Sequence, residues 1–311
     1  MTIVKGNIEE NNFIMLPKND FAFKLIFGDS KNIDVLQALL SAILNVPIEE
    51  LNELTIINNE LLREFKEDKK GILDVRAKTR NGKEINIEIQ VLPTKYMSER
   101  TAYYWSKMYN GQIKSGDTYD KLNKCITINI VDFECTPLKK IHTSYHITED
   151  ETGYRLTEVL EIHYVELSKL KKEGIEKNEN EATIQWAEFI GSDSREVMEL
   201  LATKNSDIGK AYDILTIMSK DENARMAYEA REAEIHDQAT REKTAREEGI
   251  DIGREIGREE GIDIGKTKGE FEKAIKLAEN FLRMGFSVEE VAKGSELPIE
   301  NIIEIQNKIT N

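Results

Sequence analysis

The most regular alternation of apolar and polar residues lies between residues 72 and 91, which read ILDVRAKTRNGKEINIEIQV. Residues 72–79 and 84–91 are both rich in β-branched side chains, and the pair Asn81-Gly82 lies between them. Strands favour β-branched residues, and Asn-Gly is a strong signal for a tight turn between antiparallel strands. The pattern therefore predicts a β-hairpin.

The length of the hairpin loop decides which residues face one another. A two-residue loop would place Asp74 opposite Ile89 and mix the polar and apolar faces, which a half-buried sheet resists. A three-residue loop that closes with a left-handed glycine shifts the pairing by one residue. Lys78 then faces Glu84, which is a favourable pair of opposite charges. The same register places Asp74 opposite Glu88, so we favour the three-residue loop.

The predicted pairing brings two carboxylates together. Directly paired Cβ atoms in a sheet are about 5 Å apart. Asp74 and Glu88 would repel each other at that distance unless one is protonated or a cation lies between them. Mg²⁺ or Mn²⁺ suits such an oxygen site, because both are hard cations. The alternative is that this is only the solvated polar face of an edge hairpin.

The remaining chain predicts helices and strands in an α/β order. A helix is expected over residues 20–28, with Asp20 as its N-cap and Gly28 as its stop. Further strands are expected at 53–57, 124–133, 144–149 and 154–167. Further helices are expected at 33–44, 98–114 (with Ser98 as a cap), 184–189, 195–202 and 208–218.

An Asp, a hairpin and then Glu-x-Gln resemble the core of the PD-(D/E)xK nucleases. Three segments sharpen the likeness: LPKNDFAFKLIFGD (16–29), LDVRAKTRNGKEINIEIQ (73–90) and ERTAYYWSKMYNGQIKSGDTYDKL (99–122). They are similar to the Rpn group of recombination-promoting nucleases, which are often described as transposase-like. The resemblance covers about the first two thirds of the chain. It implies an α/β (α+β) fold with a restriction-endonuclease-like αβββαβ core and a helical C-terminal extension.

The resemblance also implies roles for individual residues. Asp74, Glu88 and Gln90 would be catalytic, and a Mg²⁺ ion would be held by Asp74, Glu88 and the Ile89 carbonyl, with Mn²⁺ as a possible substitute. Leu73 stands where the motif name has Pro, and Gln90 stands where many such nucleases have Lys. Glutamine can orient a water molecule but carries no positive charge.

Further residues are expected at the edge of the site. Arg100 and Tyr104 are four residues apart on a predicted helix and would project together, with Gln112 near the same face. They could contact the scissile phosphate, although aromatic residues on this helix could equally fill the core. The resemblance places Asp20 and Lys24 near the site as accessory residues, whereas capping preference favours Asp20 as a plain helix cap.

Composition restricts how the chain could bind DNA. Of its 311 residues, 32% are charged and the formal net charge is −15, so bulk charge opposes DNA binding and any contact needs a local basic surface or metal ions. Cys125 and Cys135 have no metal-site spacing and suggest a buried thiol and a loop thiol in a reducing compartment. The first residues do not resemble a signal peptide, and no run of about 18 apolar residues occurs. We therefore expect a cytoplasmic protein with no membrane contact.

The C-terminal part of the chain has a different pattern. Residues 224–268 are rich in Ala, Glu and Arg, and glycine recurs at every fourth position from 249 to 269. On a helix of 3.6 residues per turn this repeat makes a slanted stripe of small residues and not a heptad seam. The stripe could pack closely against a second copy, or the segment could be a flexible charged linker. We favour a homo-oligomer through residues 221–270.

The last residues predict three short helices at 271–285, 288–294 and 299–309, with Ser287 as a cap. Their spacing resembles a helix-turn-helix, but the last helix is acidic and lacks arginine, which favours a protein contact over a DNA contact. The chain is thus expected to divide as follows: an N-terminal tail (1–15), a nuclease-like core (16–180), a helical support (181–220), a glycine-repeat helix (221–270) and a small helical tail (271–311).

Together these patterns predict a Mg²⁺-dependent DNA endonuclease with a role in recombination or mobile-element biology. The alternative is a nuclease-like interaction protein that has lost catalysis and assembles through its C-terminal helices. Gln90 and the acidic charge favour the alternative. The pair Asp74 and Glu88 favours the enzyme, because two facing carboxylates serve little purpose without a cation.

Overall fold

The computed structural model describes residues 13–57, 74–175 and 181–310. The chain divides into two units, Met1–Asp237 and Gln238–Asn311. Residues 1–12 of the expected N-terminal tail lie outside the described residues, as does Leu73. The tail expectation is wrong for Met15, which is fully buried in the main core and donates its N–H to the Ser219 hydroxyl at 3.0 Å.

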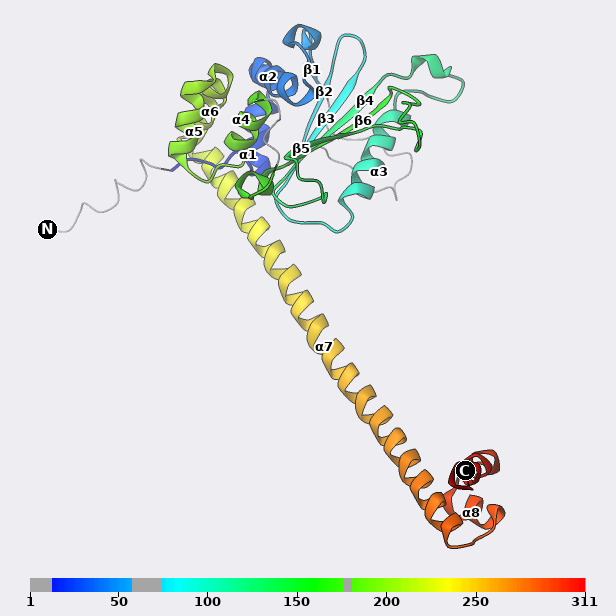
Figure 1. Ribbon diagram of the computed structural model, residues 1–311. Coiled ribbons are helices and arrows are strands. Elements are labelled where there is room, and N and C mark those ends of the chain that lie inside the picture. The colour runs from blue at the N-terminus through cyan, green and yellow to red at the C-terminus, as the bar shows by residue number, and fades with distance from the viewer. Residues whose placement is uncertain (1–12, 58–73, 176–180, 311) are drawn as a thin grey trace, which may run out of the picture. The chain divides into compact units, whose positions relative to one another are not determined.

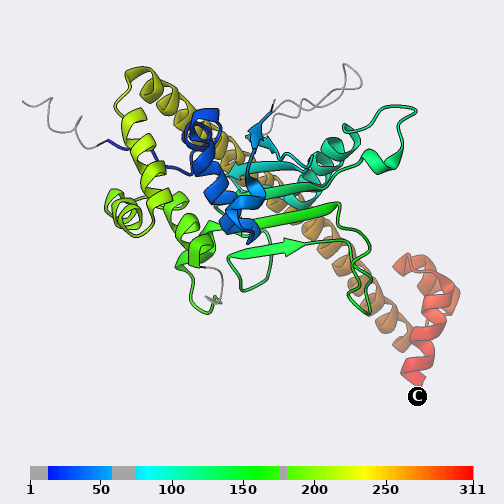
Figure 2. The same ribbon diagram turned by 90° about the horizontal axis from the view of Figure 1, so that it is seen from above.

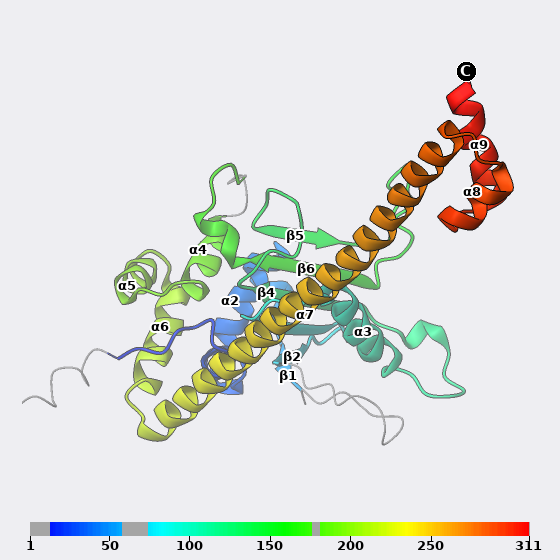
Figure 3. The same ribbon diagram turned by 90° about the horizontal axis from the view of Figure 1, so that it is seen from below.

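The first unit is built on a six-stranded mixed sheet with the order β1-β2-β3-β4-β6-β5. The strands are β1 (Thr55–Ile56), β2 (Val75–Lys78), β3 (Glu84–Gln90), β4 (Cys125–Val131), β5 (His142–Tyr145) and β6 (Leu160–Glu166). β3, β4 and β6 run parallel, and the outer pairs are antiparallel. Figure 3 shows β5 at one edge of the sheet and β1 at the other. A strand overlaps each predicted one, but β1 and β6 are shorter than predicted, and β5 begins two residues earlier and ends four residues earlier than predicted.

The predicted hairpin register is confirmed. Lys78 pairs with Glu84, and the intervening loop contains Gly82 in the left-handed region at φ 83°. Only glycine adopts this backbone conformation at little cost, so Gly82 fixes the loop type and with it the register. Asp74 lies directly before β2, and continuing the register places it opposite Glu88.

The apolar face of the sheet is covered by helices from both ends of the unit. Ile85, Ile87 and Ile89 of β3 are all buried there. Figures 1 and 2 show the N-terminal helices (blue) beside the later ones (yellow-green) on this side. The helices are α1 (Asp20–Phe27), α2 (Ile33–Leu44), α4 (Glu181–Ile190), α5 (Arg195–Lys204) and α6 (Ser206–Met218). The connections include the 3₁₀ helices η1 (Ser30–Asn32), η2 (Ile48–Leu51), η3 (Tyr119–Lys121) and η4 (Leu167–Lys171).

The opposite, more polar face of the sheet lies under α3 (Met97–Asn110). Ser98 does not cap this helix: α3 begins one residue earlier, after Tyr96, and no side chain caps it. Met97 is 4% exposed and packs in a cluster with Val131 and Tyr164, so burial of an apolar side chain fixes the start of the helix.

The second unit holds most of α7 (Glu222–Arg283) together with α8 (Val288–Ser295) and α9 (Ile299–Thr310). The expected separate helix from residue 271 is wrong, because α7 continues through that point. One glycine at position 269 costs a helix only about 1 kcal/mol, which does not break it. The last turns of α7 pack against α8 and α9, and Ser287 caps α8 as predicted. None of the described helices is long and apolar enough to cross a membrane.

Candidate active site

Asp74 and Glu88 lie on neighbouring strands at the polar face of the sheet. The Asp74 Oδ2 atom accepts a hydrogen bond from the Ile89 N–H at 2.9 Å, which ties the start of β2 to β3. In an extended strand the N–H and the carbonyl of one residue point to the same edge. The Ile89 carbonyl therefore faces the edge on which Asp74 lies, and Glu88 is the preceding residue of the same strand.

Glu88 is buried and electrostatically strained. Its residue is 4% exposed, and its Oε1 atom has no hydrogen-bond partner among the described residues. Asn86 lies nearby on the same face, but neither of its polar side-chain atoms completes a hydrogen bond there. Burial, together with the negative charge of Asp74, raises the pKa of the Glu88 carboxyl to about 7, against the positive charge of Arg100.

Arg100 connects Glu88 with Gln90. Its Nη2 atom lies 3.5 Å from Glu88 Oε2, and its Nη1 atom lies 3.5 Å from Gln90 Oε1. The guanidinium also lies over the Tyr104 ring, 5.5 Å from the centroid, so the two residues project together. The Gln90 amide donates its Nε2 hydrogen to the Leu92 carbonyl at 3.1 Å. Glu88 and Gln90 thus share one face, as expected from the alternation of a strand.

The first helix adds a lysine to this site. Lys24 Nζ lies 2.9 Å from Asp74 Oδ1 and 3.6 Å from Asp20 Oδ2. The expectation that Asp20 caps α1 is wrong: Asn19 is the N-cap and accepts hydrogen bonds from the backbone of the first turn. Asp20 instead binds Arg231 of α7, with its Oδ1 atom 2.7 Å from Nε. No local pattern in the sequence signals Arg231, because the contact joins two segments far apart in the chain.

Gln112 is not brought to the two carboxylates. Its amide donates to the Asn123 carbonyl at 3.2 Å and to the Cys125 sulfur at 2.9 Å, and its oxygen accepts from the Asn123 N–H at 2.6 Å. Cys125 pairs with Glu84, four residues before Glu88 on β3. At a rise of about 3.3 Å per residue, this places Gln112 roughly 13 Å along the sheet from the carboxylates.

A family model of PD-(D/E)XK nuclease family transposases matches residues 17–245. The chain belongs to this family. The resemblance seen in the sequence is thereby confirmed, as is the α/β fold with its helical C-terminal region. No curated protein and no solved structure matches the chain. Membership in the PD-(D/E)XK nucleases supports a nuclease-type function with DNA as substrate, and these nucleases generally use divalent metal ions.

The residues at this candidate site fit a divalent cation with few protein ligands. Among residues 13–57, 74–175 and 181–310, no group of three or more His, Cys, Asp or Glu side chains is arranged to hold a metal. Mg²⁺, however, usually keeps several waters and needs only one or two carboxylates. Asp74, Glu88 and the Ile89 carbonyl supply such a set, and the buried Glu88 Oε1 atom accepts no hydrogen bond among the described residues, which leaves its lone pairs available to a cation.

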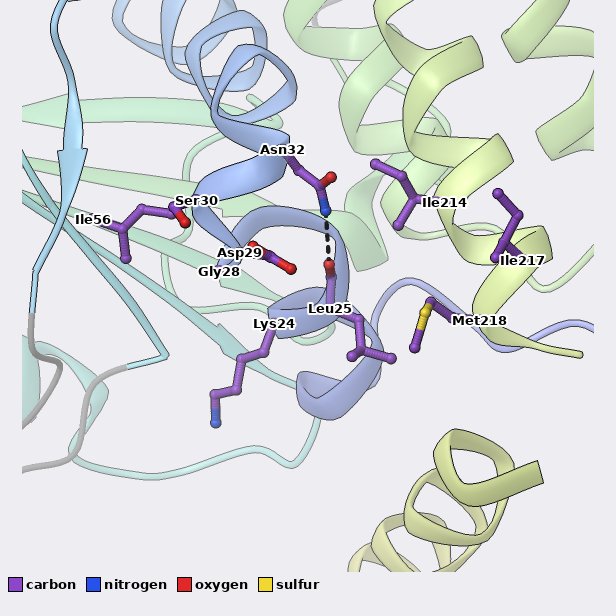
Figure 4. Close-up of a pocket in the computed structure, with 10 residues that line it drawn as sticks. All are labelled: Lys24, Leu25, Gly28, Asp29, Ser30, Asn32, Ile56, Ile214, Ile217 and Met218. Atoms are coloured by element: carbon purple, nitrogen blue, oxygen red, sulfur yellow. Dashed lines mark hydrogen bonds between the residues drawn. The ribbon is translucent and has the colours of Figure 1, made fainter. Parts of the chain in front are cut away.

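An open groove of about 570 Å³ adjoins the PD-(D/E)XK site on the side of α1. Lys24 lies at one end, and the apolar side chains of Ile214, Ile217 and Met218 from α6 lie at the other. Figure 4 shows the Lys24 amino group pointing away from these apolar residues. Burial lowers the pKa of Lys24, but Asp74 and Asp20 outweigh it and hold the pKa above its usual value, so the amine is charged.

Proposed function

We propose that the protein is a metal-dependent DNA endonuclease that acts in recombination or in the movement of mobile elements. The observation that carries this proposal is the pairing of Asp74 with a buried Glu88 whose Oε1 atom has no hydrogen-bond partner in the described part of the chain. Two carboxylates in a site of this kind repel, and burial of a charged oxygen that accepts no hydrogen bond is costly. A bound cation removes both costs.

The proposed chemistry divides between the cation and the side chains. A divalent cation supplies Lewis acidity, which lowers the pKa of a neighbouring water and neutralises charge on the phosphate. Asp74, Glu88 and the Ile89 carbonyl hold Mg²⁺, with Mn²⁺ as a substitute. Gln90 orients the attacking water through its amide oxygen, which the Arg100 guanidinium contacts at 3.5 Å.

Arg100 and Tyr104 supply the contact with the DNA backbone. The guanidinium is held by Glu88 on one side and by the Tyr104 ring on the other, and its side chain is 39% exposed. A planar guanidinium can bind two phosphate oxygens at once, whereas the formal charge of −15 opposes DNA elsewhere. The local positive charges at the site are therefore what draws the phosphate in.

We infer further that the enzyme assembles with a second copy through α7. Five isoleucines between residues 250 and 264 are each at least 45% exposed. For the six glycines of the repeat, no described heavy atom beyond the neighbouring residues and the helix's own backbone lies within 4 Å of where a Cβ would stand. A solitary helix with this much glycine and exposed isoleucine is weak, and a second copy of the same stripe would cover both.

A plasmid-nicking assay tests the enzymatic proposal. The purified full chain should convert supercoiled plasmid to the nicked form with Mg²⁺ and not with EDTA. Asp74→Ala and Glu88→Ala should each lower the rate by more than about 100-fold, because removal of a ligand removes the cation. Glu53→Ala is the matched control, since Glu53 is an exposed carboxylate that pairs with Arg80 at the surface.

Two results would contradict the proposal. One is nicking by the Asp74→Ala protein at the wild-type rate. The other is a wild-type protein that nicks no DNA with either Mg²⁺ or Mn²⁺ yet self-associates, which would favour the interaction-protein alternative.

A further inference from the structure

The third position of the family motif lacks a positive charge in this chain. The motif name ends in lysine, and here the position is Gln90. The glutamine is neutral, and its amide nitrogen is already used by the Leu92 carbonyl at 3.1 Å. A reaction that builds negative charge on a phosphate gains greatly from a fixed cation beside it. If a side chain is to add such a positive charge to that of the metal ion, it has to come from another position of the chain.

Lys24 lies where such a cation is needed. Its ammonium is 2.9 Å from Asp74 Oδ1, on the side of the carboxylate that the Ile89 N–H does not occupy. The lysine side chain is 36% exposed, so the amine borders both the buried pair and the solvent from which DNA would approach. The position is stable because α1 is capped by Asn19 and anchored by its buried residues in the main core.

A second contact holds Lys24 without neutralising it fully. Asp20 is one turn earlier on α1 and lies 3.6 Å from the lysine amine, whereas its shorter contact of 2.7 Å is with Arg231. Arg231 therefore takes much of the Asp20 charge. The Lys24 amine therefore points at Asp74 and keeps a positive charge that could also attract a phosphate.

We propose that Lys24 is a catalytic residue that replaces the motif lysine absent at Gln90. Its ammonium contacts the scissile phosphate beside Asp74 and stabilises the negative charge that develops on the phosphate oxygens. Asp20 and Arg231 are positioning residues that fix the direction of the Lys24 side chain. The inference rests on the proposed nuclease function.

Arg100 does not fill the same role. Its two contacts in the site, with Glu88 and Gln90, are both 3.5 Å long and lie on the α3 side of the sheet. Lys24 approaches from α1 and contacts Asp74 directly. The two cations thus flank the carboxylates from different elements, which suits one to hold the DNA backbone and the other to stabilise the reacting phosphate.

The decisive variants are Lys24→Met and the double variant Lys24→Met/Gln90→Lys. Single-turnover nicking is measured at saturating Mg²⁺, and Mg²⁺ affinity is measured by calorimetry on the same full-length proteins. Lys24→Met should lower the rate by about 100-fold, the usual effect of losing one such stabilising group. It should bind Mg²⁺ at least as tightly as the wild type, because a positive charge beside Asp74 has gone. The double variant, which has a lysine at position 90, should nick at least tenfold faster than Lys24→Met.

Two controls separate catalysis from structure. Lys210→Met removes a lysine that bridges Asp34 at the same 2.9 Å but lies on α6, and it should nick like the wild type. Lys24→Arg keeps the charge and should stay within about tenfold of the wild type, whereas a folded Lys24→Arg as slow as Lys24→Met would overturn the role of charge. Thermal unfolding of each variant shows that its fold is intact.

Other outcomes also overturn the proposal. The Lys24→Met protein could nick as fast as the wild type, or faster together with tighter Mg²⁺ binding. Either result would show that the lysine is only a counter-charge for Asp74. A rate that recovers with added Mg²⁺ would assign it to metal binding. In both cases wild-type nicking that depends on Asp74 leaves the nuclease proposal standing. A wild-type protein that does not nick refutes the nuclease function and this inference together.

Discussion

Replacing Glu88 by glutamine should stabilise the metal-free protein at alkaline pH. Glutamine keeps the shape of the side chain and removes its negative charge. Glu88 is only 4% exposed, and its Oε1 atom accepts no hydrogen bond from the described residues. Most substitutions of buried residues destabilise a protein. A higher stability of the Glu88→Gln protein would therefore show that the ionised Glu88 destabilises the folded state.

The size of the gain follows from the pKa of Glu88. Burial raises this pKa from 4.5 to about 7, so between these values the folded state holds a proton that the unfolded state has lost. Stability therefore falls as pH rises from about 4.5 to 7, and above pH 7 the ionised carboxylate costs about 3 kcal/mol. Glu88→Gln should recover about that amount at pH 8 and almost nothing at pH 4.5. For a unit of this size, the gain corresponds to a Tm rise of about 6–12 °C.

The measurement is thermal unfolding of both full-length proteins at pH 4.5 and pH 8 in EDTA. Added Mg²⁺ should then raise the Tm of the wild type at pH 8, because a ligand that binds only the folded state stabilises it, and it should raise that of Glu88→Gln much less. Glu84→Gln is the matched control. Glu84 is equally buried on the same face of β3, but Arg76 and Lys78 bind it at 2.5 Å and 3.5 Å, so its loss should destabilise.

Two results would refute the reasoning about Glu88. The first is a Glu88→Gln protein less stable than the wild type at pH 8 in EDTA. The second is an equal gain at both pH values, which would show that the effect comes from packing and not from ionisation.

Three further predictions concern the rest of the molecule. Gly257→Leu with Gly261→Leu should raise the helix propensity of α7 by about 1 kcal/mol in total or more. The wild type should sediment as a dimer and the double variant as a monomer, and a monomeric wild type or an equally dimeric variant would contradict the interface. Lys169→Met should cost about 3–5 kcal/mol in urea unfolding, because the fully buried Glu166 keeps its hydrogen bonds from Cys135 and Thr136 but loses the positive charge that lies 2.6 Å away, and a loss below about 1 kcal/mol would count against this. Burial lowers the pKa of His142 to about 4, so the unfolded state takes up a proton at a higher pH than the folded state. The stability of the wild type relative to His142→Gln should therefore fall as pH falls from about 6.5 to 4. A stability difference that does not change with pH would exclude a buried neutral ring.

The register of the central hairpin was determined by local sequence. The alternation of residues 84–91 fixes which side chains face the core, and Gly82 fixes the loop, so Lys78 and Glu84 could be paired without any knowledge of the remaining fold. The proximity of Asp74 to Glu88 follows from the same register. Such predictions succeed because the interacting residues are close along the chain.

Helix boundaries were decided by contacts that the sequence does not display. Asn19 and Asp20 are both good capping residues, and local preference does not separate them. The structure gives the cap to Asn19 because the Asp20 carboxylate binds Arg231, more than two hundred residues away. In the same way α3 begins at Met97, whose burial against the sheet outweighs the cap that Ser98 offers.

The electrostatics of the site also belong to the tertiary structure. The sequence indicates that Glu88 and Asp74 meet, but only the packing of α3 over the sheet removes Glu88 from water and raises its pKa to about 7. The family resemblance places Lys24 near the site as an accessory residue, but only the packing of α1 against the sheet brings its amine to 2.9 Å from Asp74. Local pattern determines which face of a strand a residue occupies, whereas burial and charge pairing depend on which distant segment covers that face.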